Sequence, residues 1–220
     1  MWRWRMNCAH RSRRRSGVLQ GMLDGVFRPE PQQLQMVMTQ LLHLNRLIDE
    51  LHLLSLADAG QLNLSKTELD LADLLRERIT WLKPQSAKAG FDIALTPGAP
   101  CRYVGDPFRL GQVFTILMEN ALRYALEGQR LDIAIAPRNG GYEITFQDKG
   151  PGVDDSFLPV MFERFSRAES SRARHSGGSG LGLSIARAIC EAHGGQISAA
   201  KKTQGGLKIT VILPPPENSQ

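Results

Sequence analysis

A chain of 220 residues is long enough for one domain with a full hydrophobic core and a smaller attached segment. Its apolar fraction of 42% is ordinary for a globular protein, and no apolar run approaches the roughly 18 residues that span a bilayer, so no membrane segment is expected. The net charge of +5 is concentrated at the start, since removing the six arginines of residues 1–15 leaves 21 basic residues against 22 acidic ones. A nucleic-acid-binding function is therefore not expected.

The three cysteines, Cys8, Cys101 and Cys190, lie far apart and lack the spacing of metal ligands. This pattern predicts reduced thiols in a cytoplasmic protein, with Cys101 and Cys190 as small buried apolar residues. The first residues, "MWRWRMNCAHRSRRRSG", show neither helical nor strand periodicity, and no acidic residue precedes Asp24. They also lack the apolar middle of a secretion signal, so export is not expected.

Residues 31–59 show helical periodicity. Pro31 suits a first helical turn and Gly60 suits a stop. Apolar residues recur at alternating three- and four-residue steps: Leu34, Val37, Leu41, Leu44, Ile48 and Leu51. A single helix cannot bury such a seam, so a partner helix is expected, either from this chain or from another.

The remaining elements follow a polar connector. We expect helices over residues 71–82, 106–125 and 181–193, and strands over 91–95, 103–104, 131–136, 142–147, 196–200 and 207–213. The segment "RNGG" predicts a hairpin turn between the third and fourth of these strands. Strands and helices do not alternate as in a doubly wound fold, so the pattern predicts an α+β layer with helices on one face of a mixed sheet.

The helix at residues 106–125 carries the polar group "LMENALRYA". Asn120, Arg123 and Tyr124 share one helical face beside Glu119, so an amide oxygen, a cation and an aromatic ring could meet one bound molecule. A surface stripe is an equally good interpretation of this motif alone.

Two further motifs follow. In "DKGPGV", Asp148 ends a strand, and Gly150 and Gly152 allow a ligand to approach the backbone, although this pattern is also a common turn. "FERF", at residues 162–165, places two phenylalanines around charges, where both rings can serve as core anchors.

A fourth motif, "GGSGLGLSIA", leads directly into a helix. Gly178, Gly180 and Gly182 leave backbone N–H groups and the helix dipole free to face an anion such as phosphate. No Gly-Lys-Ser/Thr follows, as a P-loop requires, and no strand precedes, as a dinucleotide fingerprint requires.

In this order and spacing, the four motifs resemble the N, G1, F and G2 boxes of bacterial sensor histidine kinases. "LIDELHLLSLADAG" and "FERFSRAESSRARHSGGSGLGLSIARAICEAHGG" look especially like the Bae-type envelope-stress sensor kinases. The resemblance covers residues 24–214 and implies a Bergerat-type ATPase sandwich, of the superfamily that includes DNA gyrase, preceded by a remnant of a helical-hairpin dimerisation segment.

For the base of ATP, the resemblance implies four residues. Asp148 is expected to accept a hydrogen bond from the adenine amino group, Gly150 and Gly152 to admit the purine, and Tyr124 to flank it.

For the phosphates, the resemblance implies that Asn120 holds Mg²⁺, that Arg123 faces phosphate and that Arg164 contacts the γ-phosphate. Glu119 is expected to orient or deprotonate water or a hydroxyl near the metal. The phosphate cradle is expected at Gly178, Ser179, Gly180, Leu181 and Gly182, with residues 166–178 as a lid. The family usually has a second asparagine one turn before Asn120, where this chain has Ile116.

The implied organisation is a basic head (1–23), a dimerisation-helix remnant (24–60), a linker (61–70), an ATP-binding catalytic domain (71–214) and a disordered tail (215–220). The implied function is phosphoryl transfer from Mg-ATP to histidine and then to a response regulator, in the cytoplasm, with homodimerisation through residues 31–59. The sensor and membrane segments of the inner-membrane relatives are expected to be missing here. Two alternatives remain: a nucleotide-binding pseudokinase that sequesters a response regulator, and an anti-sigma-type serine kinase, which the long seam helix disfavours.

A shifted reading frame in the nucleotide sequence explains the unusual residues 1–16. In these kinases a first hairpin helix carries the acceptor box H-E-L-R-T-P-L, which can be encoded CAT GAA CTG CGC ACA CCG CTC. Read one base later, the same message gives M-N-C-A-H-R-S, which is residues 6–12 of this chain. We therefore interpret residues 1–16 as an out-of-register translation of the acceptor helix, with the frame restored near Gly17, and do not expect His10 to accept phosphate.

Overall fold

The computed structural model describes residues 30–96, 99–167, 179–202 and 205–215. The predicted head (1–23), residues 168–178 of the lid predicted at 166–178, and residues 216–220 of the tail predicted at 215–220 lie outside this range. The chain divides into two compact units between Ile48 and Asp49.

Helix α2 (Pro31–Asp58) matches the predicted seam helix to within one residue, and Gly60 follows it with φ of +66°. The seam residues Leu34, Leu41, Leu44, Ile48 and Leu51 are between 45% and 55% exposed, whereas Leu53 and Leu54 near the end of the helix are buried. Among the described residues, no helix combines the length and apolar character needed to cross a membrane.

A five-stranded sheet forms one layer of the second unit. Its order is β2 (Asp92–Leu95), β4 (Arg130–Arg138), β5 (Gly141–Asp148), β7 (Leu207–Leu213) and β6 (Gln196–Lys201). β2 runs parallel to β4, and the other neighbours are antiparallel. A separate two-stranded sheet pairs β1 (Thr67–Asp70) with β3 (Arg102–Gly105).

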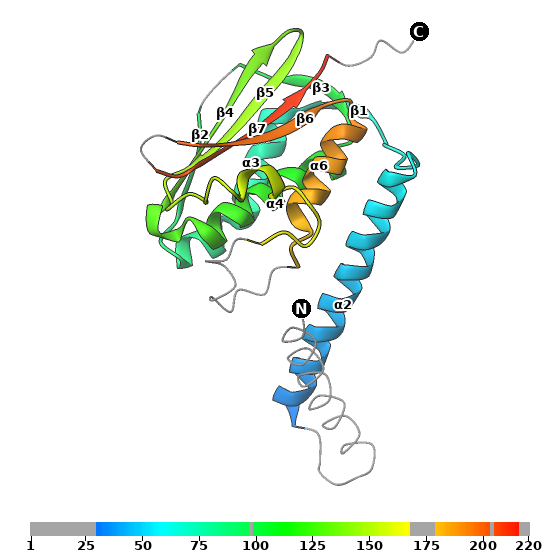
Figure 1. The fold of residues 1–220 in the computed structure, drawn as a ribbon, viewed down its shortest axis with the longest axis vertical. Helices are drawn as coiled ribbons and strands as arrows, with labels where there is room; N and C mark the ends of the chain where they lie inside the picture. Colours follow the sequence, from blue (N-terminus) through cyan, green and yellow to red (C-terminus); the bar gives the residue numbers. More distant parts are fainter. Residues whose placement is uncertain (1–29, 97–98, 168–178, 203–204, 216–220) are drawn as a thin grey trace. The chain divides into compact units, whose positions relative to one another are not determined.

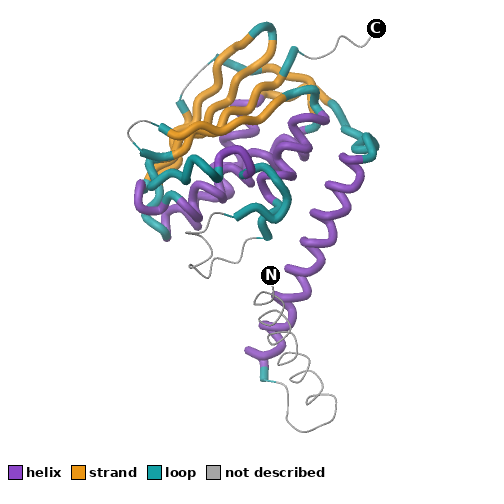
Figure 2. Tube along the Cα trace, in the orientation of Figure 1, coloured by secondary structure: helices purple, strands orange, loops and turns teal. Residues whose placement is uncertain are grey.

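Helices α3 (Leu71–Lys88), α4 (Pro107–Tyr124) and α6 (Gly182–Ala192) cover one face of the large sheet (Figures 1 and 2). Two short 3₁₀ helices, η1 (Leu126–Gly128) and η2 (Leu158–Val160), complete the unit. α4 packs between α3 and α6. The core between the layers includes Phe114, Leu117, Ile133, Ile144, Phe146, Ile185 and Val211, all at most 2% exposed. The predicted α+β arrangement is confirmed, and Cys101 and Cys190 are buried as expected.

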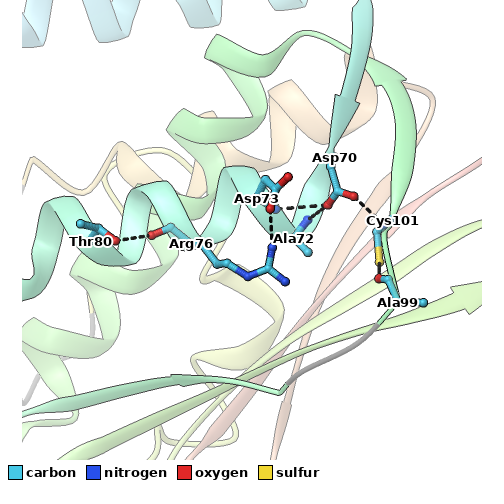
Figure 3. Close-up of polar contacts among 7 residues, drawn as sticks. All are labelled: Asp70, Ala72, Asp73, Arg76, Thr80, Ala99 and Cys101. Carbon is cyan, nitrogen blue, oxygen red and sulfur yellow. Dashed lines mark hydrogen bonds and ion pairs between the residues drawn. The ribbon is translucent and has the colours of Figure 1, made fainter.

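Two local features differ from the sequence predictions. Residues 67–70, expected within the linker, form β1, and α3 continues past Pro84 to Lys88 although its predicted end was residue 82. Leu82 and Ser86 are both buried, so packing on each side of Pro84 holds the helix together. At the start of α3, Asp70 Oδ1 accepts hydrogen bonds from the N–H groups of Ala72 and Asp73, and Oδ2 accepts one from Cys101 (Figure 3).

A buried histidine joins the start of α4 to the end of α6. His193 Nδ1 lies 2.8 Å from the Ile189 carbonyl oxygen, which can only accept, so Nδ1 carries the proton. Nε2 accepts from the Asp106 N–H at 3.1 Å, and the Asp106 carboxylate caps α4 at the Arg109 N–H and accepts from the Ser65 N–H. Burial lowers the pKa of His193, because the imidazolium is poorly solvated there.

We expect the unfolding free energy to fall on acidification below about pH 6.5, the ordinary pKa of histidine, because the unfolded chain then binds more protons than the folded one. His193→Ala is expected to destabilise the domain by about 1–3 kcal/mol and to remove this part of the pH dependence. Urea unfolding at several pH values measures both effects, with His52→Ala, an exposed histidine on α2, as the control. A pH profile that His193→Ala leaves unchanged would contradict the prediction.

Candidate nucleotide-binding site

Asp148, the predicted base-recognising carboxylate, is the last residue of β5. Its Oδ1 accepts hydrogen bonds from the Gly150 N–H at 2.9 Å and the Leu207 N–H at 3.1 Å. Burial raises the pKa of Asp148, while these two backbone donors and the charge of Lys202 oppose the increase. The carboxylate is therefore fixed in orientation and incompletely solvated, and an added hydrogen-bond donor would stabilise its charged form.

Glycines surround this carboxylate at close quarters. A Cβ atom on Gly206 would lie 2.3 Å from the Asp148 carbonyl oxygen, and one on Gly150 would lie 2.7 Å from Ala125 Cα. Gly152 has φ of +76°, which other residues rarely adopt. The absence of side chains here allows the backbone to pass close to Asp148.

The sequence did not identify Gly206 and Leu207 as neighbours of Asp148. The segment "TQGG" indicated only a turn between two strands. Their proximity to Asp148 depends on the pairing of β5 with β7, which brings residue 207 next to residue 148 across 59 positions of sequence.

The polar end of α4 lies next to the loop at residues 148–153. Ala125, at the end of α4, contacts Gly150, so the last helical turns adjoin that loop. Asn120 and Tyr124 are half-buried and lie one turn apart, whereas Arg123 is exposed; Glu119 is half-buried. The structure thus places Asn120, the expected metal-binding amide, and the ring of Tyr124 at the end of α4 that adjoins the loop at residues 148–153.

The glycine-rich motif forms the start of α6. Leu181 is the N-cap residue and makes no side-chain capping bond, although its own N–H donates to Ser179 Oγ at 3.2 Å. Gly180 has φ of +76°, and a Cβ there would lie 3.0 Å from the Phe165 backbone. A Cβ on Gly182 would lie 3.3 Å from Ile116 Cγ2. Ile116 is one turn before Asn120, so α6 begins beside the part of α4 that precedes the amide.

Arg164 and Ser179 make contacts that the sequence did not predict. Arg164 Nη2 lies 2.6 Å from both carboxylate oxygens of Asp58, at the end of α2. Ser179 Oγ donates to Glu50 Oε2 at 3.0 Å. Gly178 and the remainder of the expected lid lie outside the described residues.

These residues fit a purine nucleotide. A constrained carboxylate acceptor lies beside glycine-lined backbone, and the N-terminus of an 11-residue helix without a side-chain cap can donate N–H groups to an anion such as phosphate. Among the described residues, no three or more His, Cys, Asp or Glu side chains group as a metal site. A magnesium ion held by one amide oxygen, nucleotide phosphates and water does not require such a group.

Comparison with known proteins shows the family of the chain. Residues 105–217 match the family described as "Histidine kinase-, DNA gyrase B-, and HSP90-like ATPase". The signal transduction histidine-protein kinase BaeS of Escherichia coli (strain K12) is 40% identical over 198 residues, which cover 90% of this chain and 42% of BaeS. The chain belongs to this ATPase family, and the resemblance to sensor histidine kinases is confirmed.

Solved structures show the same fold. The histidine kinase AdeS of Acinetobacter baumannii has a TM-score of 0.74 at 25% identity, covering 91% of this chain and 92% of the solved AdeS chain. Full-length ShkA, in complex with AMPPNP, has a TM-score of 0.70 at 23% identity, covering 86% of this chain and 40% of ShkA. The predicted ATPase sandwich is confirmed, and the chain spans less than half the length of BaeS.

The position of Ile116 makes the departure from the family pattern testable. Because Ile116 lies beside the start of α6, an amide there would be close to the expected phosphate cradle and to Asn120, the expected magnesium ligand. Ile116→Asn is expected to tighten binding of the magnesium complex of ATP by about three- to tenfold, since Mg²⁺ favours oxygen ligands. Calorimetric titration with and without magnesium measures this effect, and Ile116→Ala is the control for side-chain size. Equal tightening in EDTA would contradict an effect on the metal.

Proposed function

We propose that this chain is the ATP-binding catalytic portion of a sensor histidine kinase. The observation that carries the proposal is Asp148, whose carboxylate is held by the Gly150 and Leu207 N–H groups beside glycine-lined backbone. The family match and the kinase relatives support ATP as the nucleotide and histidine as the acceptor. Full-length ShkA, which shares this fold over 40% of its chain, was solved in complex with AMPPNP.

In this proposal Asp148 recognises the base. Oδ1 keeps its two backbone donors, and Oδ2 accepts a hydrogen bond from the adenine amino group. Tyr124 flanks the ring, and Gly150 and Gly152 admit it. This added donor favours the ionised carboxylate, which burial alone disfavours.

The phosphates lie at the start of α6, where Ser179, Gly180, Leu181 and Gly182 supply backbone donors and the positive end of the helix dipole. Mg²⁺, held by Asn120, would neutralise phosphate charge. Arg123 faces phosphate, and Glu119 orients or deprotonates water or a hydroxyl near the metal. In the reaction, the bond from the γ-phosphorus to the bridging oxygen breaks, a phosphorus–nitrogen bond to histidine forms, and ADP leaves.

The half-exposed seam of α2 supports homodimerisation through residues 31–59, because leucine at this spacing favours a partner helix. A response regulator is the proposed recipient of the phosphoryl group, and the cytoplasm the proposed compartment, by analogy with the relatives.

A second candidate function rests on the head and on Ile116. A nucleotide-binding pseudokinase that sequesters a response regulator needs neither an acceptor histidine nor a complete metal site. Incubation with γ-phosphate-labelled ATP, with and without a supplied histidine-bearing dimerisation domain, separates the two. Labelling of the supplied domain supports the kinase, whereas nucleotide binding without labelling supports the pseudokinase.

A further inference from the structure

The last turns of α2 contact two side chains, Arg164 and Ser179, for which the family resemblance implies a phosphate contact. Arg164 Nη2 lies 2.6 Å from each oxygen of the Asp58 carboxylate and 3.5 Å from the Leu54 carbonyl oxygen. Ser179 Oγ donates to Glu50 Oε2 at 3.0 Å and accepts from the Leu181 N–H, at the start of α6. Two carboxylates of α2 thus engage Arg164, which precedes the glycine-rich motif, and Ser179, which lies within it.

Both contacts come from one face of the helix. Glu50, Leu54 and Asp58 lie at successive four-residue steps, which places them in one row along α2. Glu50 and Leu54 are 8% and 2% exposed, so this row packs against the domain. The Asp58 and Arg164 side chains are 63% and 40% exposed, and an ion pair with that much solvent access is weak enough to exchange.

Carboxylate and phosphate oxygens compete for the same partners. A guanidinium group binds both through N–H donors, and phosphate, with its greater charge, also favours a helix N-terminus. We propose that Asp58 and Glu50 form an acidic clasp on Arg164 and Ser179, which the terminal phosphate of a nucleoside triphosphate displaces. The proposal rests on the proposed function, because it requires the nucleotide to bind at Asp148 with its phosphates toward α6.

The clasp distinguishes ATP from ADP. ADP lacks the γ-phosphate, so with ADP bound Arg164 keeps its ion pair with Asp58. Glu50, Leu54 and Asp58 then stay packed against the domain. In ATP, the γ-phosphate binds Arg164 in place of Asp58. The last turns of α2 then lose their contact with the domain. The nucleotide state of the domain is thereby transmitted to residues 50–58 of the proposed dimerisation helix.

Removing the competing charge tests the clasp directly. Asp58→Asn is expected to tighten the binding of a non-hydrolysable ATP analogue by about three- to tenfold, an effect of the size expected for an exposed ion pair, and to change ADP affinity by less than about twofold. Asp49→Asn removes the same charge from an exposed position of the same helix and controls for net charge. Isothermal titration calorimetry of the parent and both variants with each nucleotide gives the dissociation constants.

Hydrogen exchange of the parent chain provides a readout that does not depend on a variant. Backbone amides of residues 50–58 are expected to exchange faster with the ATP analogue bound than with ADP bound. Equal exchange in the two states, or equal effects of Asp58→Asn on both nucleotides, would overturn the clasp while leaving the nucleotide site intact. A parent chain that binds neither nucleotide would overturn the clasp together with the proposed function.

Discussion

The 220-residue chain is expected to bind Mg-ATP and yet show little or no labelling of itself from γ-phosphate-labelled ATP. Autophosphorylation requires a histidine on a helix within reach of the γ-phosphate. Residues 1–23, where that helix is expected, read instead as an arginine-rich segment without helical periodicity. The carboxylate, amide and helix start proposed for nucleotide binding are all present in the domain.

Restoring H-E-L-R-T-P-L in place of residues 6–12, with a helical continuation to Asp24, is expected to recover labelling by orders of magnitude over the parent. The label should be lost in acid and retained in base, as phosphohistidine is. Glutamine in place of the restored histidine is the control and should abolish it. If the parent chain already labels itself with this acid and base behaviour, the out-of-register interpretation of the head is wrong.

Asp148→Asn is expected to remove most of the nucleotide-dependent increase in melting temperature. Loss of the charged acceptor for the adenine amino group should weaken ATP and ADP binding by about 10- to 100-fold, the range for a hydrogen bond to a charged group. Thermal unfolding with and without saturating Mg-ADP measures the effect by mass action. Asp154→Asn, an exposed position in the same loop, should retain the full shift.

The same variant is expected to be at least as stable as the parent without nucleotide. Asparagine keeps an Oδ1 acceptor for the Gly150 and Leu207 N–H groups and removes a charge that burial disfavours. Because the pKa of Asp148 is raised on folding, its ionised form opposes folding above the ordinary pKa near 4, so the advantage of the variant should shrink as the pH falls toward 4. A variant that unfolds well below the parent at neutral pH would contradict this account.

Local sequence patterns predicted most of the elements correctly. Pro107 and the Asp106 cap mark the start of α4, and Asn139 and Gly140, both with positive φ, form the turn expected between β4 and β5. Strand β1 was missed because its four residues show no clear alternation and gain their structure from pairing with β3, more than 30 residues later. The prediction ended α3 at residue 82, whereas the helix continues to Lys88 because burial on both sides of Pro84 outweighs the missing N–H.

The candidate site likewise combines features that local sequence patterns indicate with contacts that depend on tertiary packing. Asp148 and the glycine motifs could be identified from their residue types and spacing. The Leu207 donor, the contact of Gly182 with Ile116 and the engagement of Arg164 by Asp58 depend on tertiary packing between distant segments. No local pattern in the sequence specifies these contacts, so only the structure shows them.

Amide chemical-shift mapping on Mg-ADP titration tests the central claim most directly, because it reports both whether a nucleotide binds and where. The account predicts that the amides of Gly150, Gly152 and Leu207, together with those at the start of α6, shift along one saturable binding curve. A titration that leaves these amides unmoved, or that shifts only amides distant from Asp148, would contradict the assignment of this site to a nucleotide.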